Sequence, residues 1–302
     1  MFKSKNSMSR ALVRRETTAG YLFLLPSLFF FVTFVLYPMF LCIYTSFFDS
    51  NMGKNAVDVF VGLGNYKELF QDKLFLGALK NTVVIVVVAV PTVCAFSLWV
   101  ATAIYDMKPA LTSAFRCIFY LPVVTGSVAV TVVWKWMYNS RYGVFNYLFK
   151  SLGIIDQNIN WLGDARFALW CIILILFTTS VGQPIVLYVS ALGNVDHSLV
   201  EAAQVDGANR RQVFWKIKWA QIMPTTLYIL IITTINSFQC FALIQLLTSG
   251  GPTHSTDTIM YYIYYTAFKL YRYGYGNAMG VVLMIIIAAL SAVQFKLGQQ
   301  SD

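Results

Sequence analysis

The chain has 302 residues, of which 58% are hydrophobic and only 12% are charged, and its mean hydropathy is +0.64. Soluble domains carry about 25% charged residues, so this composition excludes a soluble globular protein and indicates an integral membrane protein. The formal net charge of +9 comes from basic residues that flank apolar segments, where they set membrane orientation, and it does not predict nucleic-acid binding.

Six apolar stretches are each long enough to cross roughly 30 Å of hydrocarbon as a helix, at about 1.5 Å per residue. In chain order they are Gly20 to Tyr44, Thr82 to Tyr105, Ala114 to Tyr138, Phe167 to Ser190, Thr225 to Leu247 and Asn277 to Leu297. Tyrosine and tryptophan residues stand at their ends, as interfacial aromatic belts require. The sequence therefore predicts an all-α integral membrane protein with six transmembrane helices.

The basic residues predict that both termini lie in the cytoplasm. Five Lys and Arg residues precede the first span, and further basic residues lie between the fourth and fifth spans. The expected organisation is an N-terminal tail of residues 1–19, a membrane domain of residues 20–298 with a cytoplasmic loop at about 191–223, and a C-terminal tail of residues 299–302. The first span lacks a clear small-residue cleavage site, so it is interpreted as a retained helix and not as a signal peptide.

The sequence lacks the motifs typical of ion-coupled transport, nucleotide binding, enzymatic catalysis and metal binding. No Asp or Glu lies well inside a predicted span, which disfavours ion coupling by a carboxylate relay. A GxxxxGK[ST] nucleotide loop, a GxSxG nucleophile elbow, an HExxH motif and paired catalytic carboxylates are also missing. The two histidines are far apart and the five cysteines show no paired spacing. We expect no enzymatic activity, no cofactor and no metal site in this chain.

The loop between the fourth and fifth spans has the pattern of a helical hairpin. Asp196 or Ser198 can cap a first helix, and Gly207 can adopt the positive φ that a chain reversal requires. The apolar residues Val213, Phe214 and Ile217 then recur at helical spacing, and basic residues lie on the other side of the helix. Periodicity alone leaves two interpretations open, a basic amphipathic helix on anionic lipid and a hairpin that contacts a partner.

The order of residues in this loop resembles the EAA loop of permease subunits of bacterial ABC importers. The matching residues are Glu201-Ala-Ala-x-x-Asp206-Gly207-Ala208, followed by Phe214, Ile217 and Pro224. Other segments resemble the carbohydrate-uptake group of that family, on the maltose and glycerol-phosphate importer pattern. They are Gly20-Tyr-Leu-Phe-Leu-Leu-Pro26, Phe60-Val-Gly-Leu-Gly-Asn65-Tyr66, Leu121-Pro122 through Trp134-Lys-Trp136, and Leu246-Leu-Thr-Ser-Gly250-Gly251-Pro252. The similarity covers the chain from about Gly20 onwards.

The resemblance implies the ABC importer permease fold and a coupling helix that docks on a cytoplasmic ATPase subunit. The contact and turn residues are then Glu201, Ala202, Ala203, Asp206, Gly207 and Phe214. It also implies a second homologous permease subunit, membrane lipid around both, two ABC ATPase subunits that hold ATP and Mg, and an extracytoplasmic solute-binding protein. The expected location is the plasma membrane of a bacterium.

A polar ligand that crosses the bilayer needs hydrogen-bonding groups on an interior helix face. The fifth span offers Asn236, Ser237 and Gln239, and the fourth span offers Gln183 and Tyr188. The family pattern makes these residues candidate sugar contacts. Polar side chains in spans also serve as hydrogen bonds between helices, worth about 1 kcal/mol each, and the sequence does not separate the two roles.

The predicted function is that of one permease subunit of an ATP-driven, binding-protein-dependent importer for carbohydrate, an oligosaccharide or a glycoside. Two alternatives remain open. One is an importer for glycerol phosphate, which a strongly basic intramembrane patch would favour, and the other is a membrane scaffold or channel that the basic loop anchors to lipid. In the last outer loop, Asp257, Lys269 and Arg272 could meet the binding protein, but solvated loop charge is the simpler interpretation.

Overall fold

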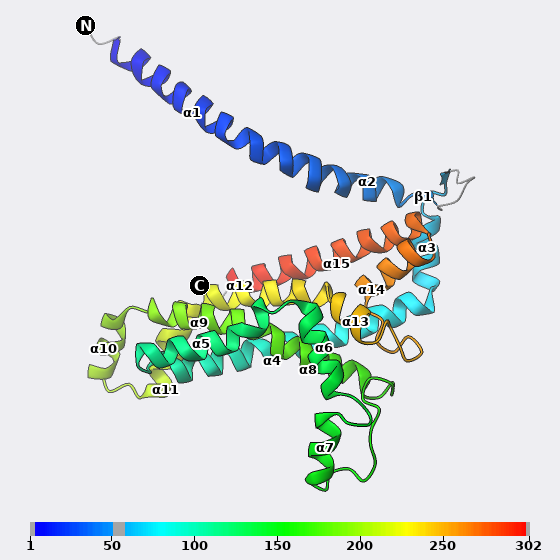
Figure 1. The fold of residues 1–302 in the computed structure, drawn as a ribbon. Helices are drawn as coiled ribbons and strands as arrows, with labels where there is room; N and C mark the ends of the chain where they lie inside the picture. The colour runs from blue at the N-terminus through cyan, green and yellow to red at the C-terminus, as the bar shows by residue number, and fades with distance from the viewer. Residues whose placement is uncertain (1–3, 51–57, 300–302) are drawn as a thin grey trace.

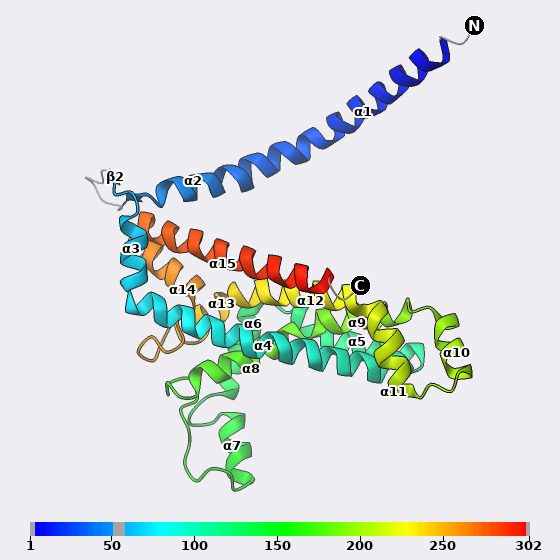
Figure 2. The same ribbon diagram turned by 180° about the vertical axis from the view of Figure 1, so that it is seen from behind.

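The N-terminal part of the chain is one long helix that leaves the rest of the molecule. The computed structural model describes residues 4–50 and 58–299, with side chains for residues 16–50 and 58–298. Helix α1 (Ser4–Phe31), a π-helical turn η1 (Val32–Leu36) and α2 (Tyr37–Thr45) follow one another without a break. The helix begins at Ser4, so residues 4–19 of the predicted tail continue into the first span without a break. Both views show α1 standing clear of the other helices (Figure 1, Figure 2).

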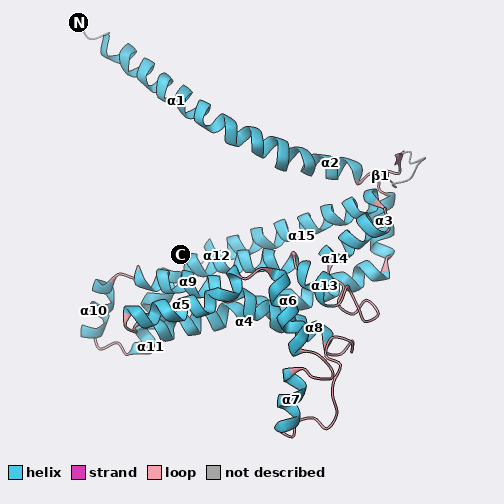
Figure 3. Cartoon of the chain, viewed as in Figure 1, coloured by secondary structure: helices cyan, strands magenta, loops and turns pink. Residues whose placement is uncertain are grey.

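Four further helical segments in the described part of the chain have the length and apolar character of membrane spans. They are α4 (Lys73–Tyr105), α8 (Ala168–Ser180) with α9 (Gly182–Gly193), the run of α11 (Arg210–Val213), η2 (Phe214–Lys218), α12 (Trp219–Phe238) and α13 (Ala242–Leu247), and α15 (Tyr273–Gln299). They cover the second, fourth, fifth and sixth predicted spans. Figure 3 shows helix almost throughout, with the short antiparallel pair β1 (Phe48–Asp49) and β2 (Val59–Phe60) at one end of the bundle.

The third predicted span, Ala114 to Tyr138, is wrong as a single straight helix. Helix α5 (Pro109–Val124) and helix α6 (Ser127–Met137) meet at an angle of 95°. Between them Thr125 has ψ 126° and Gly126 has ψ 142°, so both residues are extended and interrupt the helix. A hydropathy window measures length and apolar content only, and it cannot detect such a break. With the bent pair counted as one span, the described chain reaches the predicted total of six.

Helix α4 packs along α9 and α12. Apolar side chains from these three helices form a buried cluster that includes Val93, Ile185 and Ile229. Helix α4 also contacts the junction between α8 and α9, where the Ser97 hydroxyl donates a hydrogen bond to the Val181 carbonyl oxygen at 3.2 Å. This bond matters because Ser97 is fully buried, and a buried hydroxyl at membrane depth has no water to satisfy it.

Short helices and loops surround the end of the bundle that carries β1 and β2. Helix α3 (Gly64–Gln71), α14 (Ile259–Tyr264) and the π-helical turn η3 (Tyr265–Lys269) belong to this end. Helix α7 (Val144–Ser151) lies in a separate lobe that projects from the bundle (Figure 1). Inside that lobe, Asn146 accepts a hydrogen bond from Trp161 Nε1 at 3.0 Å and donates one to the Ile159 carbonyl oxygen at 3.0 Å. The buried amide of Asn146 therefore ties the lobe together.

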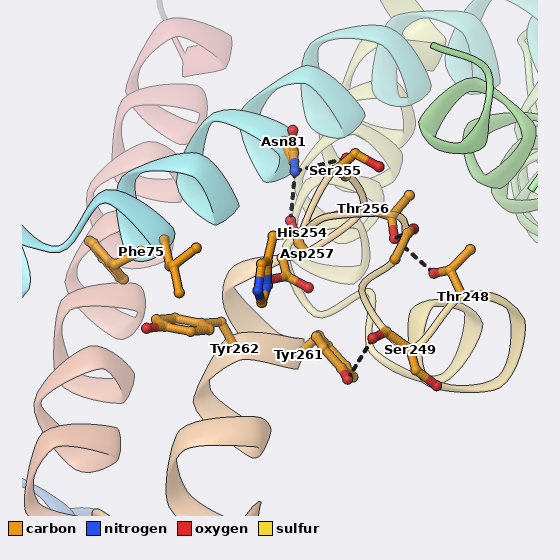
Figure 4. Close-up of polar contacts among 12 residues, drawn as sticks. Phe75, Asn81, Thr248, Ser249, His254, Ser255, Thr256, Asp257, Tyr261 and Tyr262 are labelled. Atoms are coloured by element: carbon orange, nitrogen blue, oxygen red, sulfur yellow. Dashed lines mark hydrogen bonds and ion pairs between the residues drawn. The ribbon is translucent and has the colours of Figure 1, made fainter. Parts of the chain in front are cut away.

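The loop after α13 is fastened to helix α4 (Figure 4). Asn81 of α4 donates hydrogen bonds to the carbonyl oxygens of Ser255 at 3.1 Å and Asp257 at 3.0 Å. The Asp257 side chain is only 2% exposed, and its Oδ2 lies 2.7 Å from His254 Nδ1. The interpretation of Asp257 as a solvated loop charge is therefore wrong. Burial raises the pKa of Asp257, and the hydrogen bond with His254 opposes this effect.

Polar contacts also fasten the start of α4 to α14 and α15. The Asp72 carboxylate accepts hydrogen bonds from the hydroxyls of Tyr262 at 2.8 Å and Tyr275 at 2.9 Å, and from two backbone amides in the first turn of α4. Burial raises the pKa of Asp72, but these four hydrogen bonds outweigh burial and the net direction is down. Nearby, Arg272 forms a two-pronged ion pair with Glu68, at 2.8 and 2.7 Å, so Arg272 is not a free loop charge either.

We expect Asp72→Asn to destabilise the protein at neutral pH by roughly 1–3 kcal/mol, because the amide has a single acceptor oxygen and cannot accept both the tyrosine hydroxyls and the backbone amides as the carboxylate does. Since the folded-state pKa is lowered, the ionised Asp72 stabilises the fold above its unfolded pKa of about 4, and this stabilisation is lost as the pH falls through the folded value. Thermal unfolding of the detergent-solubilised protein, from about pH 7 down to about pH 3, should show a gap between wild type and variant that closes in acid. Asp156→Asn, at an exposed loop carboxylate, should leave the curve unchanged. A gap of constant size at every pH would refute this role for Asp72.

Candidate functional site

The loop between the fourth and fifth spans folds as a helical hairpin at the end of the bundle opposite β1 (Figure 1). Asp196 caps helix α10 (His197–Val205) through a hydrogen bond from a backbone amide of its first turn. Gly207 follows the helix with φ +81°. The backbone amides of Gly207 and Ala208 donate hydrogen bonds to carbonyl groups of the last turn of α10, at 3.0 and 2.9 Å. The predicted first helix and glycine turn are both present.

The second helix of the hairpin starts at a reciprocal cap and continues into the membrane bundle. The side-chain oxygen of Asn209 accepts a hydrogen bond from the backbone amide of Gln212 at 2.9 Å, and the side-chain oxygen of Gln212 accepts one from the backbone amide of Asn209 at 2.8 Å. From Arg210 the helix runs through α11, η2 and α12 to Phe238 without a break, a length of roughly 40 Å. Pro224, the last residue of the pattern that resembles the EAA loop, lies inside α12 and does not end it.

One face of α10 is exposed and mostly apolar. Leu199, Ala202 and Val205 recur at helical spacing on this face, and Val205 is 87% exposed. Glu201 and Asp206 are exposed beside them, and within the described residues neither carboxylate has an ion-pair partner. An apolar helix stripe of this kind is typical of a surface that packs into a groove on a partner. We name these five residues the docking face.

The inner side of the hairpin closes on the bundle across a groove of about 520 Å³. Lys218 Nζ lies 5.2 Å from the centre of the Tyr105 ring of α4, and Gln221 Oε1 accepts a hydrogen bond from the backbone amide of the α10 cap residue at 3.0 Å. Phe214 lines the same groove, so this predicted contact residue lies behind the hairpin and not on the docking face. Ala203 is half-buried. The hairpin is therefore held to α4 and α12 by defined contacts.

Three neighbouring cavities follow helix α5 from its start to its bend with α6, and we name them together the polar path. The first, of about 520 Å³, is lined by α5 and α9. The second, of about 150 Å³, adds α12, and the third, of about 330 Å³, lies at the bend between α5 and α6. Gln183 and Leu187 line both the first and the second cavity, and Val123 and Thr179 line both the second and the third. The shared residues show that the three cavities adjoin one another.

Three of the five predicted sugar contacts line the polar path. Asn236 and Gln183 line the second cavity together, although they come from different spans, and Gln239 lines the third. Ser237 and Tyr188 are 2% and 1% exposed, and among the described residues they line none of the three cavities. Tyr188 instead belongs to the buried cluster between α4, α9 and α12.

Helices α5 and α9 touch backbone to backbone beside the second cavity. A Cβ placed on Gly182 would overlap the Phe119 carbonyl oxygen of α5 and would lie 2.9 Å from Val123 Cγ2. No side chain fits at this crossing without moving α5. Gly182 directly precedes Gln183. The close approach of α5 and α9 therefore sets the width of the polar path at the second cavity, which Gln183 and Asn236 both line.

The geometry thus joins a docking surface at one end of a membrane bundle to a polar path within it. A family model described as "Binding-protein-dependent transport system inner membrane component" matches residues 73–299, more than half of the chain. The chain belongs to this family. It is accordingly a multi-pass inner membrane protein and a transport subunit, not an enzyme. The predicted relationship to ABC importer permeases is confirmed.

This inner membrane component resembles other permeases along nearly its whole length. It is 33% identical over 288 residues to the probable ABC transporter permease protein YesP of Bacillus subtilis (strain 168), covering 94% of this chain and 91% of that protein. It is 32% identical over 288 residues to the lactose transport system permease protein LacF of Rhizobium radiobacter, covering 94% and 95%. A chain of the bacterial alginate ABC transporter, solved in complex with an alginate pentasaccharide-bound periplasmic protein, superposes with a TM-score of 0.82 at 23% identity, covering 95% of this chain and 96% of that chain. The predicted permease fold is confirmed.

Sequence reasoning missed one polar group of the permease, Thr179 of α8, which lines the second cavity. Thr233, one of the polar residues of the fifth span, lines the same cavity. Thr179 and Gln183 are four residues apart, which places them on one helix face, and this spacing was the available signal. Thr234, next to Thr233, instead accepts a hydrogen bond from Gln294 of α15 at 2.9 Å. Of these two neighbouring threonines, one therefore lines the path and the other bonds a second helix, and composition alone does not reveal which does which.

The permease was expected to lack a metal site. Across the residues whose side chains are described, 16–50 and 58–298, no group of three or more His, Cys, Asp and Glu side chains is close enough together to hold a metal ion.

Proposed function

We propose that this permease subunit forms half of the translocation pathway of an ATP-driven, binding-protein-dependent importer for carbohydrate, an oligosaccharide or a glycoside. The observation that carries the proposal is the unbroken helix from Arg210 to Phe238, which begins at the hairpin and bears Asn236 beside the polar path. A push on the hairpin would move one wall of the path as a rigid rod. Support for carbohydrate comes from the relative named for lactose transport and the structural neighbour named for alginate.

The docking face would pack into a groove on a cytoplasmic ATPase subunit. In this arrangement Leu199, Ala202 and Val205 supply apolar contact, and Glu201 pairs with a basic residue of the partner. Two ATPase subunits would hold ATP and Mg and carry out hydrolysis. The hairpin end of the bundle and both chain termini would then lie in the cytoplasm of a bacterium, and a separate solute-binding protein would deliver the sugar at the opposite end.

A second, similar permease would cover the remaining side of the polar path and the first helix. No residue in the most apolar window of the first span is buried within this chain. Phe23 is 85% exposed and Tyr21 is 68% exposed. A helix that is apolar all round needs lipid or another protein around it. Helix α1 reaches past the edge of the bundle, where a neighbouring subunit would pack against it (Figure 2).

The two alternatives that the sequence left open differ in their support. A glycerol-phosphate importer remains in the same class of transporter and differs only in the substrate. The lipid-anchored scaffold or channel has no support from the family, whose members are components of binding-protein-dependent transport systems. Sugar-stimulated ATP hydrolysis by the assembled complex is therefore the first measurement, because a scaffold would give none.

We expect Asn236→Ala and Gln183→Ala each to lower sugar uptake about fivefold, since each removes a hydrogen-bonding group worth about 1 kcal/mol from the path wall. Uptake of labelled sugar into proteoliposomes that contain the complete transporter checks this, with ATP hydrolysis measured in parallel. Gln294→Ala is the matched control, because this amide pairs with Thr234 between helices and does not line the path. Equal effects of all three changes would mean that the amides only hold helices together.

A further inference from the structure

One cation lines the polar path at its hairpin end. Arg116 lies seven residues into α5, which places it roughly 10 Å along the helix from its start. It lines the first cavity with Ser113, Cys117 and Tyr120 of its own helix, and Gln183 of α9 completes the polar lining. Arg116 is half-buried. Its side chain therefore forms part of the path wall and does not simply extend into lipid or water.

No other lining residue of the polar path carries charge at neutral pH. The second and third cavities are lined by apolar, hydroxyl, thiol and amide side chains, among them Asn236, Gln239 and Thr179. The first cavity adds Arg116 and no carboxylate. Basic residues of the hairpin, such as Arg210 and Lys218, line the separate groove behind α10. Along the described lining, the electrostatic character of the path is thus positive at one point and neutral elsewhere.

Arg116 has no partner for its charge within the described residues. The ion pairs of the described chain involve Arg166, His254 and Arg272, and none involves Arg116. A half-buried guanidinium without a counter-ion is costly at membrane depth, and such residues characteristically mark a substrate or ion pathway. Its planar fork of donors matches the two oxygens of a carboxylate or a phosphate. A cation held in a path wall with no carboxylate beside it is suited to a passing anion.

We propose that the carbohydrate moved by this permease carries an anionic group, and that Arg116 binds that group as the sugar reaches the hairpin end of the path. This inference rests on the proposed import function and narrows its substrate to acidic sugars. The shared chemistry is a carboxylate or a phosphate on a sugar, and uronate-containing oligosaccharides and sugar phosphates are its two sources. Gln183, which faces the same cavity, would bind hydroxyl groups of the same substrate.

The test uses the complete transporter with its binding protein in proteoliposomes, offered a galacturonate oligosaccharide, a neutral oligosaccharide of equal length and a sugar phosphate. We expect the wild type to import one of the two anionic sugars in preference to the neutral one. Arg116→Gln should lower uptake of that sugar roughly tenfold, because hydrogen bonds to charged groups are the stronger ones. Arg116→Lys should restore part of the loss. Lys108→Gln removes a charge from the exposed start of the same helix and should leave uptake unchanged.

The outcomes separate this inference from the function on which it rests. A transporter that imports the neutral sugar as well as the anionic ones, and is indifferent to Arg116→Gln, overturns the assignment of Arg116 while import stands. A transporter that hydrolyses ATP without importing any sugar overturns the proposed function itself. If Arg116→Gln and Lys108→Gln reduce uptake equally, the charge serves membrane orientation only and the proposal is wrong. Preference for the galacturonate or for the phosphate decides between the two sources of the anion.

Discussion

Gly207→Pro is expected to abolish sugar-stimulated ATP hydrolysis by the assembled transporter while leaving the subunit in the membrane. Proline is held near φ −65°, and Gly207 has φ +81°, so the turn between α10 and α11 cannot form. Even alanine would cost about 1–2 kcal/mol at this backbone conformation. Without the turn, the docking face loses its fixed angle to the long helix that begins at Arg210. The measurement is ATP hydrolysis by the purified complex with and without sugar-loaded binding protein.

The chain offers a closely matched control for this substitution. Gly153 follows helix α7 just as Gly207 follows α10, with φ +68° and open space around it, but it lies in the lobe that projects from the bundle. Gly153→Pro should disturb that lobe and leave the coupling of hydrolysis to sugar intact. Glu201→Lys should reduce stimulation by at least tenfold if its carboxylate pairs with a basic partner residue. Stimulation that survives both Gly207→Pro and Glu201→Lys would show that the hairpin is not the coupling element.

Gly182→Ala should destabilise the permease and distort the polar path, in spite of adding only one methyl group. The new Cβ would overlap the Phe119 carbonyl oxygen, so α5 would have to move away from α9. Overpacking of this kind typically costs 1–3 kcal/mol. Because Gln183 is the next residue, we also expect uptake to fall further than the loss of stability explains. Thermal unfolding in detergent and uptake per folded transporter are the two measurements.

Gly77→Ala is the matched control, and we expect it to change stability in the opposite direction. Gly77 lies inside α4 with no atom within 4 Å of the position that its Cβ would take. Alanine is favoured over glycine in a helix interior by about 1 kcal/mol, so this variant should be slightly more stable and transport normally. Unfolding midpoints that move in the same direction for both variants would show that the crossing at Gly182 is looser than the structure indicates.

The features that the sequence predicted correctly depend on local order along the chain. The hairpin could be anticipated because a cap, a glycine and an apolar repeat all lie within the residues that form it. The spans could be anticipated because length and apolar content are local too. The 95° bend at Thr125 and Gly126 could not, since neither residue forbids a helix.

The features that escaped prediction depend on contacts between distant segments. Gln183 and Asn236 line one cavity, but their sequence separation gives no sign of it. Asp257 was interpreted as a solvated charge, yet Asn81, 176 residues away, bonds its backbone and His254 covers its carboxylate. Ser237 and Tyr188 had the same polar chemistry as the path residues and differ from them only in the direction that each faces. Side-chain direction in a helix bundle follows from rotation about the helix axis, which polarity alone does not fix.

Helix α1 also bears on how the transporter is made. Synthesis delivers this helix to the membrane before the helices that follow it, and the bundle that those helices build leaves it outside (Figure 1). A copy of the chain made in excess would present the exposed apolar side chains of α1 to the first neighbour it meets, another copy included. Balanced production of the two permeases would then matter to the cell as much as their affinity for each other. An unpaired first helix is also a feature by which a membrane protease could single out subunits that have found no partner.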